Sequence, residues 1–183
     1  MKINKKMKHH FLTIFFIIVV IISCKRDRPI TQYPKKDKSQ RKENLIKINK
    51  YFVKKDAEQI ESYIKRRNWD MEISESGLFY MIYESGNGQK AKKNKIAHIN
   101  YKLTLLDGTY CYSSDSSGVK SFIIGKGGVE AGLEEGILLL REGDKARFIM
   151  PPHLAHGLIG DENKIPARAI IIYDVEVAEI SDK

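Results

Sequence analysis

The sequence predicts an α+β fold, in which an antiparallel β-sheet wraps around one short α-helix and an amphipathic helix precedes the sheet domain. Three observations carry this prediction. Apolar residues recur at helical spacing before residue 68, strand-like runs separated by glycine turns dominate after residue 77, and only one segment of this second part has helical spacing. The predicted organisation has four parts, over residues 1–23, 24–42, 43–67 and 68–183.

The first part, residues 1–23, has the pattern of a signal peptide. Four lysines and no acidic residue precede an apolar core at residues 11–22, which is interrupted only by Thr13. This core is shorter than the ~20 apolar residues that a membrane-spanning helix needs. It ends in Ile-Ile-Ser-Cys at residues 21–24, which resembles the lipobox of bacterial lipoproteins, so Cys24 is the expected site of lipidation. An uncleaved signal anchor is the alternative.

The charge of the chain is unevenly spread. Residues 25–67 hold fifteen Lys and Arg against six Asp and Glu, whereas residues 68–183 hold thirteen against seventeen. A basic segment next to a lipid anchor favours contact with anionic headgroups, where each cation contributes ~1 kcal/mol. A solvated segment without a binding role is the alternative. Because a lipid-anchored protein outside the cytoplasm rarely meets nucleic acid, we expect no nucleic-acid partner.

Two segments lie between Cys24 and the sheet domain. Residues 24–42 are rich in Lys, Asp, Ser, Gln and Pro and have few apolar residues, which predicts a disordered basic tether. In residues 43–67 the apolar side chains that recur at helical spacing are Leu45, Ile48, Phe52, Ile60 and Ile64. The predicted amphipathic helix packs on the following domain, pairs with a second copy or lies on the membrane, so a homodimer stays open.

The segment after residue 77 predicts several short strands and one helix. The strand-like runs cover residues 77–83, 96–105, 110–112, 122–124, 145–150 and 169–180. Asp107-Gly108 between two of these runs is a preferred hairpin turn. The predicted helix covers residues 133–141 and places Leu133, Ile137 and Leu140 on one face.

Several classes of chemistry lack their residues. Cys111 is the only cysteine after Cys24, which excludes a disulfide within a lipidated mature chain. His153 and His156 follow two prolines, which argue against a helix that would bring both imidazoles to one metal ion. No P-loop ending or nucleophile elbow is present. We therefore expect no metal, no cofactor and no hydrolase or kinase activity.

Four pieces of the second half resemble a known family. They are Gly-Leu-Glu-Glu-Gly at residues 132–136, Pro-Pro-His-Leu-Ala-His-Gly at 151–157, Ile-Pro at 165–166 and the strand-like run at 169–177. In this order and spacing they resemble the FK506-binding-protein (FKBP) family of peptidyl-prolyl cis-trans isomerases. The resemblance extends over residues 77–180 and implies an FKBP-like sheet around a short helix, with an apolar pocket for proline-containing polypeptides. Bacterial FKBP lipoproteins of this layout include members associated with gliding motility.

The resemblance also implies the site residues. The expected catalytic residues are Tyr101, Val129, Glu130, Leu133, Ile165 and Tyr173. Glu130 is included for its backbone N–H, which in the family meets the ligand carbonyl, although the side chain there is normally aliphatic. The expected substrate-binding residues are Cys111, Tyr112, Phe122 and His156.

Four of these positions depart from the family pattern. Cys111 and Tyr112 stand where the family has phenylalanine and aspartate, and Leu133 replaces the tryptophan of the best-known members. His156 replaces a tyrosine that hydrogen-bonds bound peptides. The base of the implied pocket stays apolar, so the departures affect its polar contacts most.

The predicted function is that of a prolyl isomerase, lipid-anchored in the bacterial cell envelope facing the periplasm or the cell surface, that assists the folding of exported proteins. Rotation about an X-Pro bond needs no acid, base or metal ion. An apolar pocket that removes water from the twisted amide binds this state in preference to the planar one. The alternatives are a non-catalytic FKBP-fold chaperone or binding module, which the four departures favour, and a structural lipoprotein whose basic helix is the working part.

Overall fold

The computed structural model describes residues 38–182. The signal peptide, Cys24 and the tether up to residue 37 lie outside the described residues. The chain divides into two units, 1–42 and 43–183, and of the first unit only residues 38–42 are described, as helix. Within residues 38–182 no helix combines the length and the apolar character needed to cross a membrane.

The predicted amphipathic helix is present as α2, Lys38–Arg67. It begins five residues before the expected boundary, so the expectation of a tether is wrong for residues 38–42. Asn68 adopts a left-handed φ of 52° directly after the helix. The last turn carries Lys65, Arg66 and Arg67, whose positive charges lie favourably at the carbonyl end of the helix dipole.

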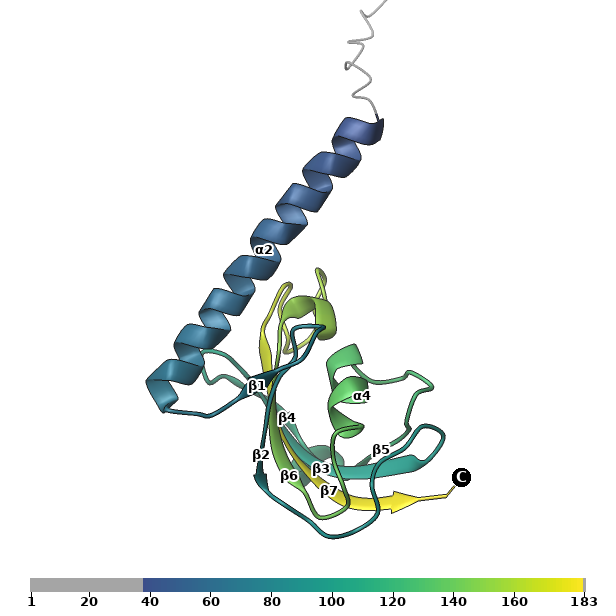
Figure 1. Cartoon of the computed structure of the whole chain (residues 1–183). Helices are drawn as coiled ribbons and strands as arrows, with labels where there is room; N and C mark the ends of the chain where they lie inside the picture. The colour runs from purple at the N-terminus through teal and green to yellow at the C-terminus, as the bar shows by residue number, and fades with distance from the viewer. Residues whose placement is uncertain (1–37, 183) are drawn as a thin grey trace, which may run out of the picture. The chain divides into compact units, whose positions relative to one another are not determined.

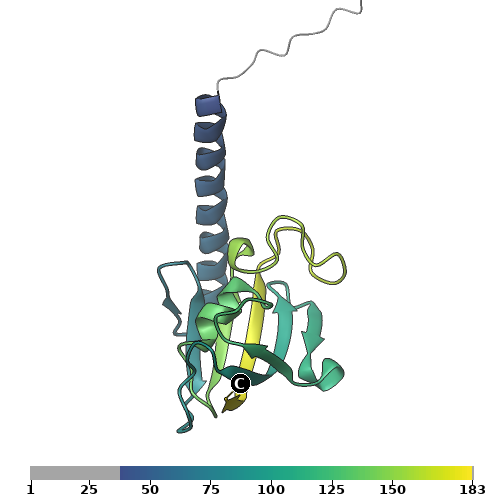
Figure 2. The same cartoon turned by 90° about the vertical axis from the view of Figure 1, so that its right-hand side faces the viewer.

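The rest of the chain forms a curved antiparallel sheet (Figures 1 and 2). Its strands are β1 (Glu72–Ile73), β2 (Phe79–Glu84), β3 (Ile96–Leu105), β4 (Tyr110–Ser113), β5 (Lys120–Ile123), β6 (Lys145–Met150) and β7 (Ile171–Ser181). The strands lie in the order β1-β2-β6-β7-β3-β4, and β5 pairs with β3 beyond this path. The C-terminal strand β7 is therefore central, between β6 and β3.

The predicted α+β fold with a sheet around a short helix is confirmed. Strands β3 and β6 have the predicted bounds, but the inner helix α4 covers Ala131–Ile137, so the predicted end at residue 141 is wrong. After Ile137 the chain continues in tight turns, such as the bond from the Leu140 N–H to the Ile137 carbonyl at 3.0 Å. The two-residue β1 and the short helix α3 (Ser114–Ser117) have no predicted counterpart.

Helix α4 packs on one face of the sheet and forms the main core there (Figure 1). Leu133 and Ile137 of α4 are fully buried, as the predicted face requires, and Leu140 is fully buried in the turns after the helix. Gly136 lies so close to the sheet that a Cβ atom on it would be 2.7 Å from Cζ of Phe148. The glycine therefore sets how closely the helix approaches the sheet.

The C-terminal half of α2 covers the opposite face of the same strands. Successive strand residues point to opposite faces, so Phe148 belongs to the α4 core while Ile149 belongs to a second cluster. This second cluster joins the helix residues Ile60 and Tyr63 to the sheet residues Phe79, Ile149 and Ile172 and to Ile170, directly before β7. Packing on the domain, one of the three roles expected of the helix, is therefore what this half of α2 does.

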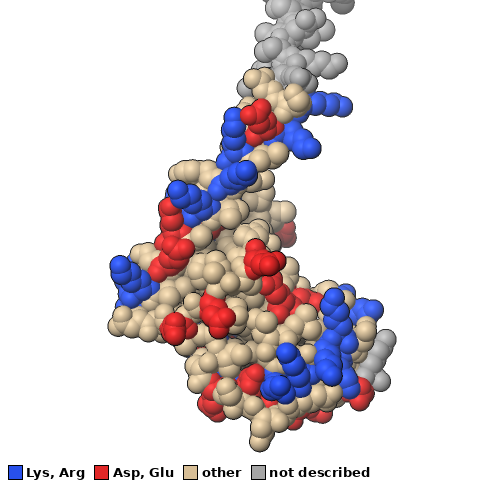
Figure 3. All heavy atoms as spheres, viewed as in Figure 1, with Lys and Arg blue, Asp and Glu red and all other residues tan. Residues whose placement is uncertain are grey.

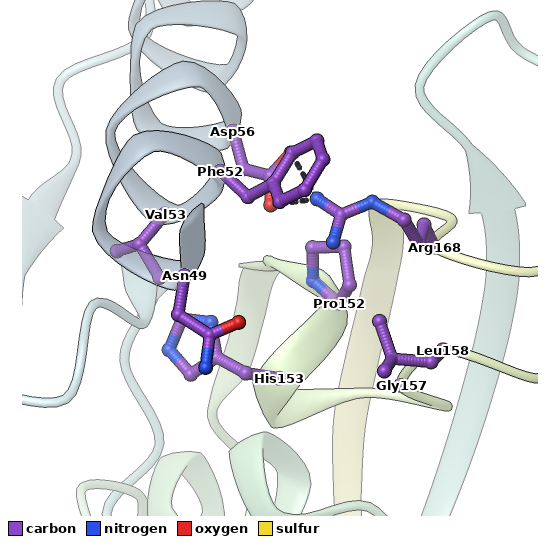
Figure 4. A pocket seen from close by; sticks show the side chains of 9 residues that line it. All are labelled: Asn49, Phe52, Val53, Asp56, Pro152, His153, Gly157, Leu158 and Arg168. Atoms are coloured by element: carbon purple, nitrogen blue, oxygen red, sulfur yellow. Dashed lines mark hydrogen bonds and ion pairs between the residues drawn. The ribbon is translucent and has the colours of Figure 1, made fainter. Parts of the chain in front are cut away.

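An ion pair extends this contact to the long loop before β7. Asp56 of α2 receives hydrogen bonds from Nη2 of Arg168 at 3.0 and 3.3 Å, and the Arg168 guanidinium lies 4.0 Å from the ring centroid of Phe52. The Arg168 N–H donates to the carbonyl of Gly157 at 3.0 Å, which closes the base of the loop. These side chains line a groove of ≈ 380 Å³ that also includes Leu158 (Figure 4).

Candidate active site

Two aromatic rings form one wall of the candidate site. Tyr101 lies on β3 and Tyr173 on the adjacent β7, and their ring centroids are 5.6 Å apart at an interplanar angle of 41°. The strand register pairs Leu103 with Tyr173 and Tyr101 with Val175, so both tyrosines project from the same face of the sheet. Leu133 and Ile165, the two expected aliphatic residues, are buried in the core of that face.

The N-terminus of α4 supplies the second side of the site. Glu130 is the N-cap residue, and its carbonyl accepts hydrogen bonds from the N–H groups of Leu133 at 2.9 Å and Glu134 at 3.0 Å. Among the hydrogen bonds of residues 38–182, none is donated by the Glu130 N–H. Val129 packs partly buried against the core directly before it. A backbone donor at a helix N-terminus is well placed to orient a carbonyl group.

The side chain of Glu130 gives the site a polar side that the sequence does not suggest. Its Oε1 accepts hydrogen bonds from the Tyr173 hydroxyl at 2.9 Å and interacts with Nε2 of His156 at 3.1 Å. The ammonium of Lys120 donates to the Tyr173 hydroxyl at 3.0 Å and lies 3.7 Å from Oε2 of Glu130. It also lies 5.1 Å from the ring centroid of Tyr101. We call Lys120, Glu130, His156 and Tyr173 the polar cluster.

Burial and the neighbouring Glu130 raise the pKa of the Tyr173 phenol far above its usual range. A raised phenol pKa means that Tyr173 stays protonated at all physiological pH values. Its hydroxyl therefore donates to Glu130 while it accepts from Lys120, which links the cation and the carboxylate through one phenol. The polar cluster is a connected chain of hydrogen bonds rather than four separate contacts.

Phe122, expected as a wall of the pocket, is buried in the same core as Leu133, Ile165 and Tyr173. Its cross-strand partner is Ala97 of β3. Lys120, two residues earlier on β5, is the residue whose side chain reaches the two tyrosine rings. Because alternate strand residues share a face, a strand through Phe122 predicts that Lys120 lies on the same face of the sheet. The family resemblance pointed to an aromatic residue at this wall, so Lys120 was not expected there.

Cys111 and Tyr112 connect β4 to the long loop that carries Ile165. The Tyr112 hydroxyl donates to Oδ2 of Asp161, and Oδ1 of the same carboxylate accepts from the Ile165 N–H at 2.7 Å. The hydrogen bond to Asp161 and partial burial raise the pKa of Tyr112. Lys164 donates to the Cys111 carbonyl at 2.9 Å. Asp161, which the sequence reasoning missed, thus holds the loop beside β4.

No group of three metal-ligating side chains is found among residues 38–182. The arrangement instead offers two aromatic rings, a buried aliphatic base and a backbone donor beside them. Such a site can hold an apolar ring and orient an adjacent carbonyl without forming a covalent bond.

The comparisons with known proteins agree with this geometry. Residues 87–178 match the family model of the FKBP-type peptidyl-prolyl cis-trans isomerases. The FKBP-type isomerase FkpA of Buchnera aphidicola is 34% identical over 142 residues, covering 77% of this chain and 52% of the relative. FkpA of Escherichia coli K12 is 32% identical over 127 residues, covering 69% and 45%. The chain therefore spans about half the length of these relatives.

Solved structures show the same likeness. The crystal structure of FkpA from Escherichia coli superimposes with a TM-score of 0.62 at 25% identity, covering 99% of this chain and 75% of that one. The structure of AtFKBP13 gives 0.58 at 30% identity, covering 60% and 98%. Together with the family match, these findings establish that the chain belongs to the FKBP-type peptidyl-prolyl cis-trans isomerase family.

Proposed function

We propose that this protein is a peptidyl-prolyl cis-trans isomerase that assists the folding of exported polypeptides. The observation that carries the proposal is the Tyr101–Tyr173 pair above buried Leu133 and Ile165, with the Glu130 N–H beside it. Family membership supports the same activity.

The geometry suits amide rotation because the barrier is electronic. Twisting an X-Pro bond costs ~18–20 kcal/mol, since amide resonance is lost. The twisted amide has less charge on its carbonyl oxygen, so it loses less than the planar amide when water is removed. Rings that hold the pyrrolidine and a backbone donor that fixes one carbonyl therefore stabilise the transition state more than the ground state.

Exchange spectroscopy by NMR on short proline peptides tests the activity. Uncatalysed exchange takes tens to hundreds of seconds, so acceleration by the protein is directly visible. The proposal predicts acceleration by residues 25–183, a loss of at least about tenfold in Tyr101→Ala, and little change in Tyr83→Ala, an exposed tyrosine of β2. Absence of acceleration in the unmodified protein would exclude the isomerase.

The second candidate function is a non-catalytic binding module for proline-containing or apolar segments. The polar cluster favours it, because Lys120, Glu130 and His156 place charged and polar groups where an isomerase pocket is expected to be apolar. A binding module would shift the peptide resonances in the same NMR titration without accelerating exchange. The two functions are therefore separated by one data set.

We further propose that lipidated Cys24 anchors the protein in the bacterial cell envelope, facing the periplasm or the cell surface, with the FKBP domain at residues 68–183. The lipobox-like residues 21–24 support this anchor. Figure 3 shows lysine and arginine side chains along α2, with acidic ones among them, and these cations support contact of the helix with anionic headgroups. Cys24→Ser should abolish metabolic labelling with a fatty acid, and labelling that persists would refute the anchor.

The exposed half of α2 supports a homodimer. Leu45, Ile48 and Tyr51 are each at least half exposed, whereas Ile60 and Tyr63 further along the helix are buried. Pairing of two such helices would cover these apolar side chains. Light scattering on residues 25–183 should give twice the mass of one chain, and Ile48→Glu should reduce it to one. A monomer at high concentration would exclude the dimer.

A further inference from the structure

The Glu130 carboxylate is satisfied on one side only. Its side chain is 9% exposed, and Oε1 has two hydrogen-bonding partners, the Tyr173 hydroxyl and Nε2 of His156. The second oxygen, Oε2, is shielded from solvent and has no hydrogen-bond partner among residues 38–182. A carboxylate has about four acceptor positions, so half of this group's capacity is unused in a place that water does not reach.

The nearest cation does not fill the unused positions. The Lys120 ammonium lies within ion-pair distance of Oε2, at 3.7 Å, but its short hydrogen bond, at 3.0 Å, goes to the Tyr173 hydroxyl. A buried acceptor without a donor is costly, and more so when it is charged. The free protein therefore holds an acceptor that an incoming donor can satisfy at a gain.

The position of this acceptor makes it part of the substrate site. The Glu130 carboxylate accepts a hydrogen bond from the hydroxyl of Tyr173, whose ring contacts that of Tyr101. Glu130 is also the N-cap residue of the helix that contains Leu133. The more exposed members of the polar cluster are Lys120 and His156, each with 27% side-chain exposure. The flexible Lys120 side chain can yield to a ligand group. A prolyl ring packed against the tyrosine wall lies next to the polar cluster, so movement of Lys120 would open Oε2 to the neighbouring peptide residue.

We propose that Glu130 determines substrate specificity, by accepting a hydrogen bond from a side-chain donor on the residue next to the proline. The inference rests on the proposed isomerase or peptide-binding function. A hydroxyl or ammonium group satisfies Oε2, and hydrogen bonds to a charged acceptor are about twice as strong as neutral ones. An isosteric apolar residue leaves the carboxylate unsatisfied, and a site built to receive a donor rejects analogues that lack it.

Two isosteric peptides test this specificity with the purified full chain. Ala-Thr-Pro-Phe and Ala-Val-Pro-Phe differ in one hydroxyl group, and Ala-Lys-Pro-Phe with its norleucine counterpart separates an ammonium from an apolar stem. NMR exchange gives kcat/KM, and a titration of the same samples gives Kd. The unmodified protein should favour Thr over Val, and its Thr-to-Val ratio should exceed that of Glu130→Ile by about tenfold or more.

Two further variants make the result decisive. Glu130→Gln keeps the size of the side chain and removes its charge, so it should lower the ratio even if Glu130→Ile folds poorly. Glu135→Gln, on the same helix but hydrogen-bonded to Ser76, should leave the ratio unchanged. Equal ratios in the unmodified protein and both Glu130 variants would overturn the inference.

The NMR data distinguish a lack of isomerase activity from a lack of substrate specificity at Glu130. If no peptide exchanges faster, the isomerase is excluded, and the ratio of Kd values still decides the role of Glu130. If exchange is accelerated equally for Thr and Val by every variant, the isomerase stands and the specificity role is refuted. A preference confined to the lysine peptide would restrict the donor to a cation.

Discussion

Breaking the ion pair between Asp56 and Arg168 should destabilise the protein far more than the loss of a surface ion pair does. The perturbation is Arg168→Met, which keeps most of the side-chain stem and removes the guanidinium. Asp56 is 9% exposed, so the variant leaves a carboxylate that is largely out of water and has lost both hydrogen bonds from Arg168. The guanidinium also leaves the ring of Phe52.

The structure sets the expected magnitude. Removing one partner of a fully buried ion pair costs ~3–5 kcal/mol, whereas exposed pairs contribute ~0–1 kcal/mol. The Asp56 side chain is 12% exposed and that of Arg168 is 32% exposed, so the pair lies between these limits. We expect a loss of about 2–3 kcal/mol, including ~0.5–1 kcal/mol from the contact with Phe52.

Urea unfolding of residues 25–183 measures this loss. The fluorescence of Trp69, the only tryptophan, reports directly on the helix contact, because its ring packs 5.7 Å from Tyr63 and 4.0 Å from the Arg147 guanidinium. Asp56→Asn and the double variant complete a double-mutant cycle, in which a coupling energy of ~1–3 kcal/mol is expected for groups in contact. A loss below ~0.5 kcal/mol with no coupling would refute the reasoning, since it would equate the pair with an exposed one.

Three further changes have defined outcomes. Gly136→Ala should lower the urea midpoint by the equivalent of ~1–3 kcal/mol, because its Cβ would lie 2.7 Å from Phe148, and an unchanged midpoint would contradict the packing. Asp144→Ala should cost ~2–4 kcal/mol in the same assay, because this buried carboxylate accepts two backbone N–H bonds, at 2.6 and 2.7 Å. The Cys111 thiol should react slowly with a disulfide reagent at pH 7 and rapidly in urea, because burial raises its pKa and lowers the thiolate fraction. Rapid reaction of the folded protein would contradict that burial.

Much of the fold was predictable because local pattern and tertiary structure agree. Strands β3 and β6 follow runs of branched and aromatic residues between turns, and both have the predicted bounds. Helix α4 ends earlier than its apolar spacing suggests, because Arg141 forms a bridge with Lys90 and the chain must turn before it. The spacing of apolar residues within one segment cannot predict a contact with a segment about fifty residues away.

The apolar part of the candidate site was predictable, and its polar part was not. Tyr101, Leu133, Ile165 and Tyr173 were expected together, and the structure places them in or against one core. The polar cluster draws Lys120, Glu130 and His156 from three separate segments, and only the folded chain shows that they meet. Glu130 was expected to act through its backbone alone, so its buried carboxylate is the main addition that the structure makes.

The central position of β7 has a consequence for how the chain is made. Synthesis proceeds from the N-terminus, and β7 (Ile171–Ser181) follows both β3 and β6 in the sequence. Before β7 is made, β3 and β6, which flank β7 in the finished sheet, have no strand between them. Until β7 pairs with them, the backbone N–H and C=O groups on the facing edges of β3 and β6 lack their partners. Such unpaired strand edges promote association with other chains. A protein proposed to assist the folding of others thus completes its own sheet only after β7, which follows both of its neighbours in the sequence, has been made.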